Sequence, residues 1–113
     1  MAATKDRAAI TQLTASGTST ALDISTAYRA SLYLRHYNGT GSVTGAATIT
    51  VQVKASGGTM TTMRIVSAST VTSGADHWVI VLPDDSVSVQ VVYVAPSGAS
   101  GYTLDAEVGR LTG

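Results

Sequence analysis

Residues 48–54, with the sequence TITVQVK, decide the fold because their apolar and polar residues alternate strictly. The odd-numbered positions hold Ile or Val, and the even-numbered positions hold Thr, Gln or Lys. Successive side chains of an extended chain point to opposite faces, so the apolar residues share one face. The stretch therefore predicts a β-strand that buries one face and leaves the other in water.

Seven further runs of similar composition surround this strand, and turn sequences rich in Gly, Pro, Asn and Asp separate them. The predicted strands are residues 8–15, 20–25, 30–37, 61–71, 77–82, 87–95 and 102–110. No window of useful length has the period of an amphipathic helix. We therefore predict an all-β fold: a single-domain antiparallel β-sandwich of about eight strands, with either jelly-roll or Ig-like connections.

The length of 113 residues suits one domain with one hydrophobic core. Residues 8–113 are expected to form the β-sandwich. Residues 1–7 (MAATKDR) have no apolar face to bury, so we expect a flexible N-terminal arm there. The expected core consists of apolar residues that share one parity within their strands: Ile49, Val51, Val53, Met63, Ile65, Trp78, Ile80, Leu82, Val87, Val89 and Val91.

The charge of the chain argues against several classes of partner. Charged residues make up 12% of the sequence, and seven basic residues balance seven acidic ones. Without a net charge, no long-range field draws the chain onto phosphates or anionic lipid, so we expect neither nucleic acid nor a membrane as partner. Low charge is also typical of surfaces that another protein covers, although a soluble domain rich in Thr and Ser has the same composition.

Residues that could support catalysis or hold a cofactor are few. The chain has no cysteine and only two histidines, His36 and His77, which lie in different predicted strands. A nucleophile elbow of the form G-x-S-x-G is absent from the sequence, and a zinc site needs three or four ligands. We therefore expect no enzymatic activity, no bound metal and no cofactor.

The acidic residues have structural explanations beside the chemical ones. Asp84 and Asp85 follow Pro83 and suit a turn, although their oxygens could bind calcium. Asp105 and Glu107 fall on one face of a strand, where a glycosidase-like pair is geometrically conceivable. We prefer a solvated outer face as the explanation of this second pair.

A row of aromatic and basic residues is the first candidate for a contact surface. Tyr33, Arg35 and Tyr37 fall on one side of their strand, while Leu32 and Leu34 fall on the side that should face the core. The outward row suits a protein interface or stacking on a sugar. It also fits a strand face that is simply exposed.

A second candidate surface follows from a hairpin predicted between residues 77–82 and 87–94. A four-residue turn, PDDS, would set the two strands side by side with their core residues in register. The reverse face of the hairpin would then carry His77, Val79, Val81, Val92 and Val94. Because contiguous exposed apolar patches usually mark interfaces, we expect this face to pack against a second copy of the chain or another protein.

The whole sequence resembles the small all-β virion proteins of tailed bacteriophages, particularly capsid decoration or cement proteins. The resemblance rests on length, the absence of Cys, low charge, strands rich in Thr, Ser, Ala, Gly and Val, the start MAATKDRA, and the stretch DISTAYRASLYLRHYNGT at residues 23–40. No single motif fixes it.

This resemblance implies a structural protein that binds the outside of a phage capsid and stabilises it. Its partners would be the major capsid protein or other virion proteins, and copies of the chain itself in a homo-oligomer. The chain would be made in the host cytoplasm and end in the virion. The alternatives are another phage part, such as a head-to-tail connector or a tail or fibre module, and a β-sandwich that binds carbohydrate or another ligand.

Overall fold

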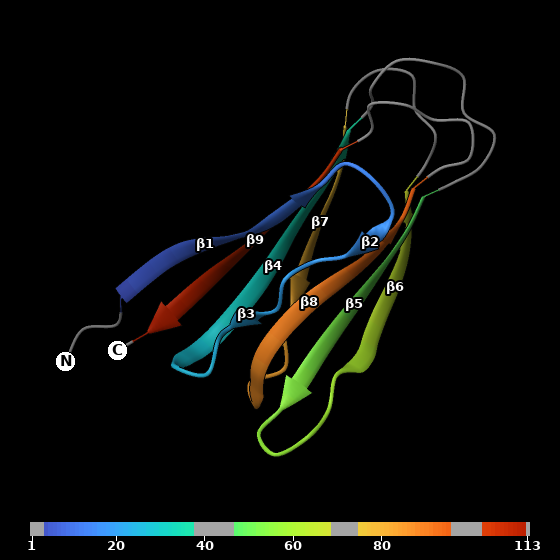
Figure 1. The fold of residues 1–113 in the computed structure, drawn as a ribbon. Coiled ribbons are helices and arrows are strands. Elements are labelled where there is room, and N and C mark those ends of the chain that lie inside the picture. Colours follow the sequence, from blue (N-terminus) through green and yellow to red (C-terminus); the bar gives the residue numbers. More distant parts are fainter. Residues whose placement is uncertain (1–3, 38–46, 69–74, 96–102, 113) are drawn as a thin grey trace.

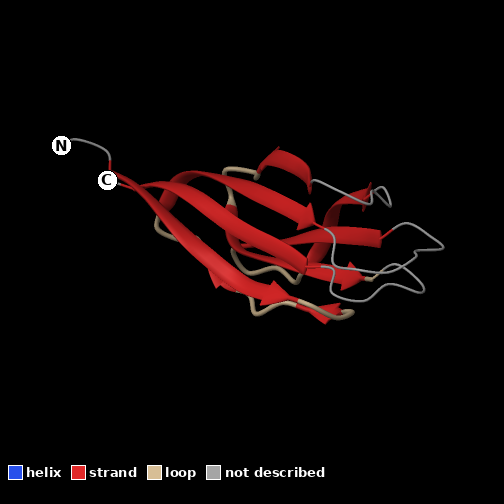
Figure 2. Cartoon of the chain, turned by 90° about the horizontal axis from the view of Figure 1, so that it is seen from above, coloured by secondary structure: helices blue, strands red, loops and turns tan. Residues whose placement is uncertain are grey.

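The computed structural model describes residues 4–37, 47–68, 75–95 and 103–112, and these form nine β-strands in two antiparallel sheets. The first sheet has the order β1-β9-β4-β7, and the second has the order β2-β8-β5-β6, with β3 also paired to β8 (Figure 1). Figure 2 shows strands and loops without a helix in this part of the chain. The strands are β1 (Thr4–Leu13), β2 (Gly17–Thr18), β3 (Leu22–Asp23), β4 (Ala27–Tyr37), β5 (Ala47–Ala55), β6 (Thr61–Ala68), β7 (Ala75–Val81), β8 (Ser86–Val94) and β9 (Thr103–Thr112).

The strand order is that of a jelly roll, which decides between the two connection patterns expected. β2 and β3 both pair with β8 and together fill one strand position, so each sheet has four positions. The chain repeatedly leaves one sheet for the other, and only β5 and β6 are consecutive strands of the same sheet apart from β2 and β3. Every predicted strand has a counterpart, although the predicted strand 20–25 is present only as the two-residue β3.

The core lies between the two sheets and confirms most of the predicted set. The buried members are Ile49, Val51, Ile80, Leu82, Val89 and Val91, and the half-buried members packed against them are Val53, Met63 and Trp78. Val87 is half-buried near the start of β8, where the pairing with β5 is irregular. The prediction is wrong for Ile65, whose side chain is 61% exposed, while the neighbouring Val66 is buried. The pairing of β5 with β6 is irregular between Val51 and Gln52, which leaves Met63 as an extra residue in β6. Such a bulge reverses the parity of the residues beyond it.

A polar contact crosses the core and joins the two sheets. His36 of β4 and Tyr93 of β8 are both buried, and the Nε2 atom of His36 lies 2.7 Å from the Tyr93 hydroxyl oxygen. The two rings are tilted by 57°, with centroids 5.5 Å apart. Because buried polar groups are nearly always hydrogen-bonded, this contact lets an imidazole occupy a core-facing position of β4.

Of the flexible arm expected at residues 1–7, residues 4–7 form a strand instead, and residues 1–3 lie outside the described residues. Residues 4–7 belong to β1 and pair with the last residues of β9, so the two ends of the described chain lie side by side (Figure 1). Arg110 donates hydrogen bonds from Nε and Nη2 to the two carboxylate oxygens of Asp6, at 2.8 and 3.0 Å. Arg110 also donates from Nη1 to the backbone carbonyl of Asp23, at 3.1 Å. Strand pairing and an ion pair therefore hold a segment that lacks an apolar face of its own.

The predicted hairpin between β7 and β8 does not form. β7 pairs with β4 in the first sheet, whereas β8 pairs with β5 in the second, so the chain crosses between sheets after β7. Asp84 and Asp85 lie in a turn, as predicted, and the Ser86 amide donates to the Pro83 carbonyl at 3.0 Å. The alternation of apolar and polar residues predicts both strands correctly. A strand shows the same alternation in either sheet, because it depends only on which face of the strand is buried. The alternation therefore could not identify the partner strand.

Candidate protein-binding surface

The outer face of the first sheet unites residues from both predicted contact sets. In the pairing of β4 with β7, Tyr33 lies opposite Val79 and Arg35 lies opposite His77. Val79 and Val81 are 61% and 70% exposed, and Arg35 and His77 are exposed as well. Two rows that were predicted separately are therefore neighbours on one surface.

The remaining predicted contact residues do not join this surface. Val92 and Val94 belong to β8, where Val92 lies opposite Thr50 of β5 and faces away from the core of the second sheet. The thickness of the sandwich separates them from Val79, so the single apolar face expected from the hairpin is wrong. The backbone of Tyr37 pairs within the first sheet, but its side chain lies outside what the structure describes.

Four rows of side chains cross the outer face of the first sheet, and we call these residues the first-sheet face. From one end of the sheet to the other, the rows are Lys5, Leu111 and Arg29; Arg7, Gly109, Ser31 and Val81; Ala9, Glu107, Tyr33 and Val79; and Asp105, Arg35 and His77. The first row is basic, while the edge formed by β7 is apolar apart from His77. The surface thus has both a charged and an apolar region.

Tyr33 is fixed at the centre of the first-sheet face by contacts on β9 and β1. A Cβ atom at Gly109 would stand only 3.0 Å from Cε2 of the Tyr33 ring, so the ring occupies space that a side chain would take. The guanidinium carbon of Arg7 lies over the ring, 5.1 Å from its centroid. A sugar that stacked on this face of Tyr33 would have to displace Arg7, which weakens the carbohydrate-binding hypothesis.

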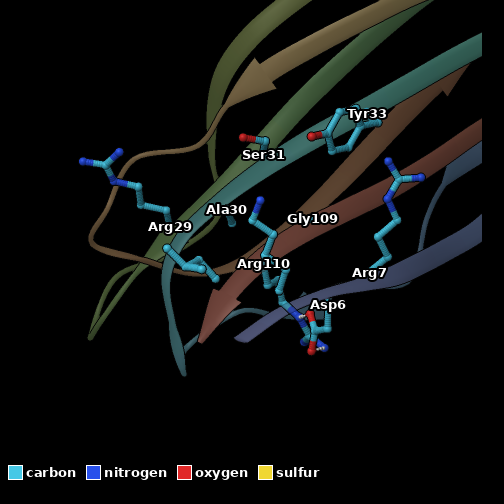
Figure 3. Close-up of a pocket in the computed structure, with 10 residues that line it drawn as sticks. Asp6, Arg7, Arg29, Ala30, Ser31, Tyr33, Gly109 and Arg110 are labelled. Carbon is cyan, nitrogen blue, oxygen red and sulfur yellow. Dashed lines mark hydrogen bonds and ion pairs between the residues drawn. The ribbon is translucent and has the colours of Figure 1, made fainter. Parts of the chain in front are cut away.

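Two open depressions on this surface share Tyr33 and Arg7 as a common wall. The larger has a volume of about 550 Å³ and lies at the basic end of the sheet, beside Lys5 and Arg29 (Figure 3). The smaller has a volume of about 300 Å³ and lies beside Trp78 and Val79. Residues of β1, β4 and β9 line both hollows.

The acidic residues of β9 hold the first sheet together. Gln12 of β1 donates from Nε2 to Oδ1 of Asp105 at 2.5 Å, and Nη1 of Arg7 lies 3.2 Å from Oε2 of Glu107.

Within the described ranges, no three His, Cys, Asp or Glu residues are grouped closely enough to hold a metal ion. The same ranges contain no helix that is long and apolar enough to cross a membrane.

The strand order and the first-sheet face define the chain as a small jelly-roll β-sandwich with one amphipathic outer face. Among solved structures, it is similar to the crystal structure of the SPBc2 prophage-derived protein YomS, with a TM-score of 0.61. The likeness covers 99% of this chain and 96% of that chain at 11% sequence identity, so it shows a common fold. No protein-family model matches the sequence, and no curated protein matches it.

Proposed function

We propose that this chain is a structural protein of a bacteriophage virion, which binds the outside of the capsid through the first-sheet face and stabilises it. The observation that carries the proposal is the exposure of Val79 and Val81 beside Tyr33 on the outer face of the first sheet. The low charge of the chain and its likeness in fold to a prophage-derived protein support it further. In this role the chain acts by binding other virion proteins and copies of itself, not by catalysis.

The edge strand β7 gives the proposal a second physical basis. β7 pairs with β4 on one side, and no other described strand pairs with its free side. Exposed sheet edges are commonly protected by Lys, Pro or a bulge, because unpaired backbone groups invite pairing with another chain. From His77 to Val81 the edge has none of these features, and its outward residues Val79 and Val81 are apolar. Such an edge is suited to being covered in an assembly.

Another position in the virion is the second candidate function. A head-to-tail connector or a tail or fibre module would use the same apolar edge and the same outer face. The likeness to YomS supports a phage origin but favours no particular place in the particle. Under both candidates the chain is made in the host cytoplasm and ends in the virion.

The experiment uses particles of the phage that encodes the chain, prepared without its gene. Purified chain is mixed with these particles or with isolated tails, and bound chain is measured after sedimentation. We expect saturable binding to capsids and a higher temperature of DNA release from the decorated particles. Binding to tails alone would contradict the capsid role and favour the second candidate. Absence of binding to any particle would contradict both.

A further inference from the structure

The basic end of the first-sheet face contains two cations that pair with no carboxylate of the described residues. Lys5 and Arg29 lie in one row of the sheet, on either side of Leu111. Neither forms an ion pair with a carboxylate among the described residues, whereas Arg7 pairs with Glu107 and Arg110 pairs with Asp6. Because the whole chain is neutral, this excess of positive charge is a local feature of the surface.

The neighbouring Arg110 does not add to this excess. It lies opposite Ala30, a buried residue, and therefore extends on the other side of the strands, where Asp6 binds it with both carboxylate oxygens (Figure 3). The hydrogen bond from Arg110 also lowers the pKa of Asp6 below its ordinary value of 3.8, because it stabilises the ionised carboxylate. The two charges cancel, and the outer side of the depression keeps those of Lys5 and Arg29.

The floor of the depression lies beside the ring of Tyr33. The ring covers Gly109, and Ser31 on the adjacent strand offers a hydroxyl group to the hollow. Adjacent strands lie about 4.8 Å apart, which sets Lys5 and Arg29 about 10 Å apart across β9. Their long side chains can reach a carboxylate placed between them from both sides. In Figure 3, Arg29 and Ser31 follow one another along β4, with Gly109 on the adjacent strand.

We infer that the partner presents an acidic segment of protein, whose carboxylates bind Lys5 and Arg29 and whose apolar residues cover Val81 and Val79. This inference rests on the proposed function and names the chemistry of the partner. The row that contains Gly109 and Ser31 ends at Val81 and lies next to the row of Lys5 and Arg29. One extended segment could therefore contact both the basic region and the apolar region.

A protein segment fits this surface better than a nucleic acid does. Nucleic-acid binding depends on neutralising a run of phosphates, whereas the basic end of this face offers two cations, Lys5 and Arg29, outside the ion pairs of the described residues. Glu107 and Asp105 continue the same face and would repel a phosphate backbone. The exposed Val79 and Val81 offer it no hydrogen bonds, whereas they are natural contacts for apolar side chains.

Charge reversal on the particle tests the inference in the setting of the proposed function. Arg29→Glu and Lys5→Glu should each weaken particle binding about tenfold or more at physiological salt, because each places a negative charge against the acidic segment. Arg64→Glu is the matched control, since Arg64 is also exposed on a strand but belongs to β6 of the second sheet. It should bind within about twofold of the wild type, which is the range expected of a charge outside the contact.

The outcomes separate the inference from the proposed function. If the wild-type chain binds particles and all three charge reversals bind equally well, the inference is overturned while the proposed function stands. If the wild type binds no particle, the proposed function fails, and a titration with a hexaglutamate peptide then decides the inference alone. We expect NMR shifts confined to the amides around Lys5, Arg29 and Gly109. Dispersed shifts, or tighter binding of a single-stranded DNA of equal charge, would overturn it.

Discussion

Replacing Val79 with Glu tests the apolar edge of the first-sheet face. Burial of a whole Val side chain is worth about 1.5–3 kcal/mol. Since Val79 is 61% exposed, about 1–2 kcal/mol remains to be gained when a partner covers it. Val79→Glu would forfeit this gain and add the cost of an unpaired carboxylate in the contact, several kcal/mol more. Because 1.4 kcal/mol is a factor of ten, we expect particle binding to weaken about a hundredfold or more.

Ile65 provides a matched control for this substitution. It is also β-branched and 61% exposed, and it lies on β6, an edge strand of the second sheet. Ile65→Glu should bind particles like the wild type, and both variants should keep their unfolding free energy within about 1 kcal/mol of it. Sedimentation with particles measures binding, and urea denaturation measures stability. Equal binding by the two variants, or unfolding of Val79→Glu, would refute the reasoning.

Three further predictions concern the stability of the fold, measured by denaturation. Tyr93→Phe removes the hydroxyl partner of His36 and should lower the free energy of unfolding by about 1–3 kcal/mol. Adding His36→Leu to this variant should recover part of the lost stability. A double variant whose loss equals the sum of the losses of the two single variants would contradict this. Deleting residues 1–7 should lower the melting temperature because it removes pairing with β9, and an unchanged temperature would show that this pairing contributes nothing. The hydrogen bond from Arg110 lowers the pKa of Asp6, so the stability that the ionised Asp6 contributes is present above pH 3.8 and is lost as the pH falls through the lowered pKa. The variant Asp6→Asn should therefore lose less stability in acid than the wild type does. Coincident profiles of stability against pH for the two proteins would count against the ion pair.

The alternation of side chains predicted strands and their buried sides well, because both depend on local sequence. In β4, for example, Leu32 and Leu34 are predicted on the core side and are both buried, as is His36 on the same side of the strand. The failures concern features that alternation does not record. The extra residue Met63 in β6 changes which of the residues beyond it face the core, so Ile65 is exposed. No residue type in that strand indicates a bulge.

The first-sheet face could be predicted only in parts. The rows of Tyr33 and Val79 were each recognised, but their contact depends on pairing between strands that are distant in the sequence. The basic depression was missed because Lys5 was assigned to a flexible arm. One signal could have indicated it: Gly109 interrupts a strand, and a glycine there often marks a close approach, which Tyr33 makes here.

The most direct test of the central claim is the protection of single thiols on the bound chain. The chain contains no cysteine, so Val79→Cys and Ile65→Cys each introduce one thiol, at positions of equal exposure on opposite sheets. Maleimide labelling of each variant is compared in free solution and on the particle, with the labelled fraction measured by mass spectrometry. The account predicts that particle binding strongly slows labelling at position 79 and leaves position 65 unchanged. Labelling of position 79 at the same rate in both states would contradict it.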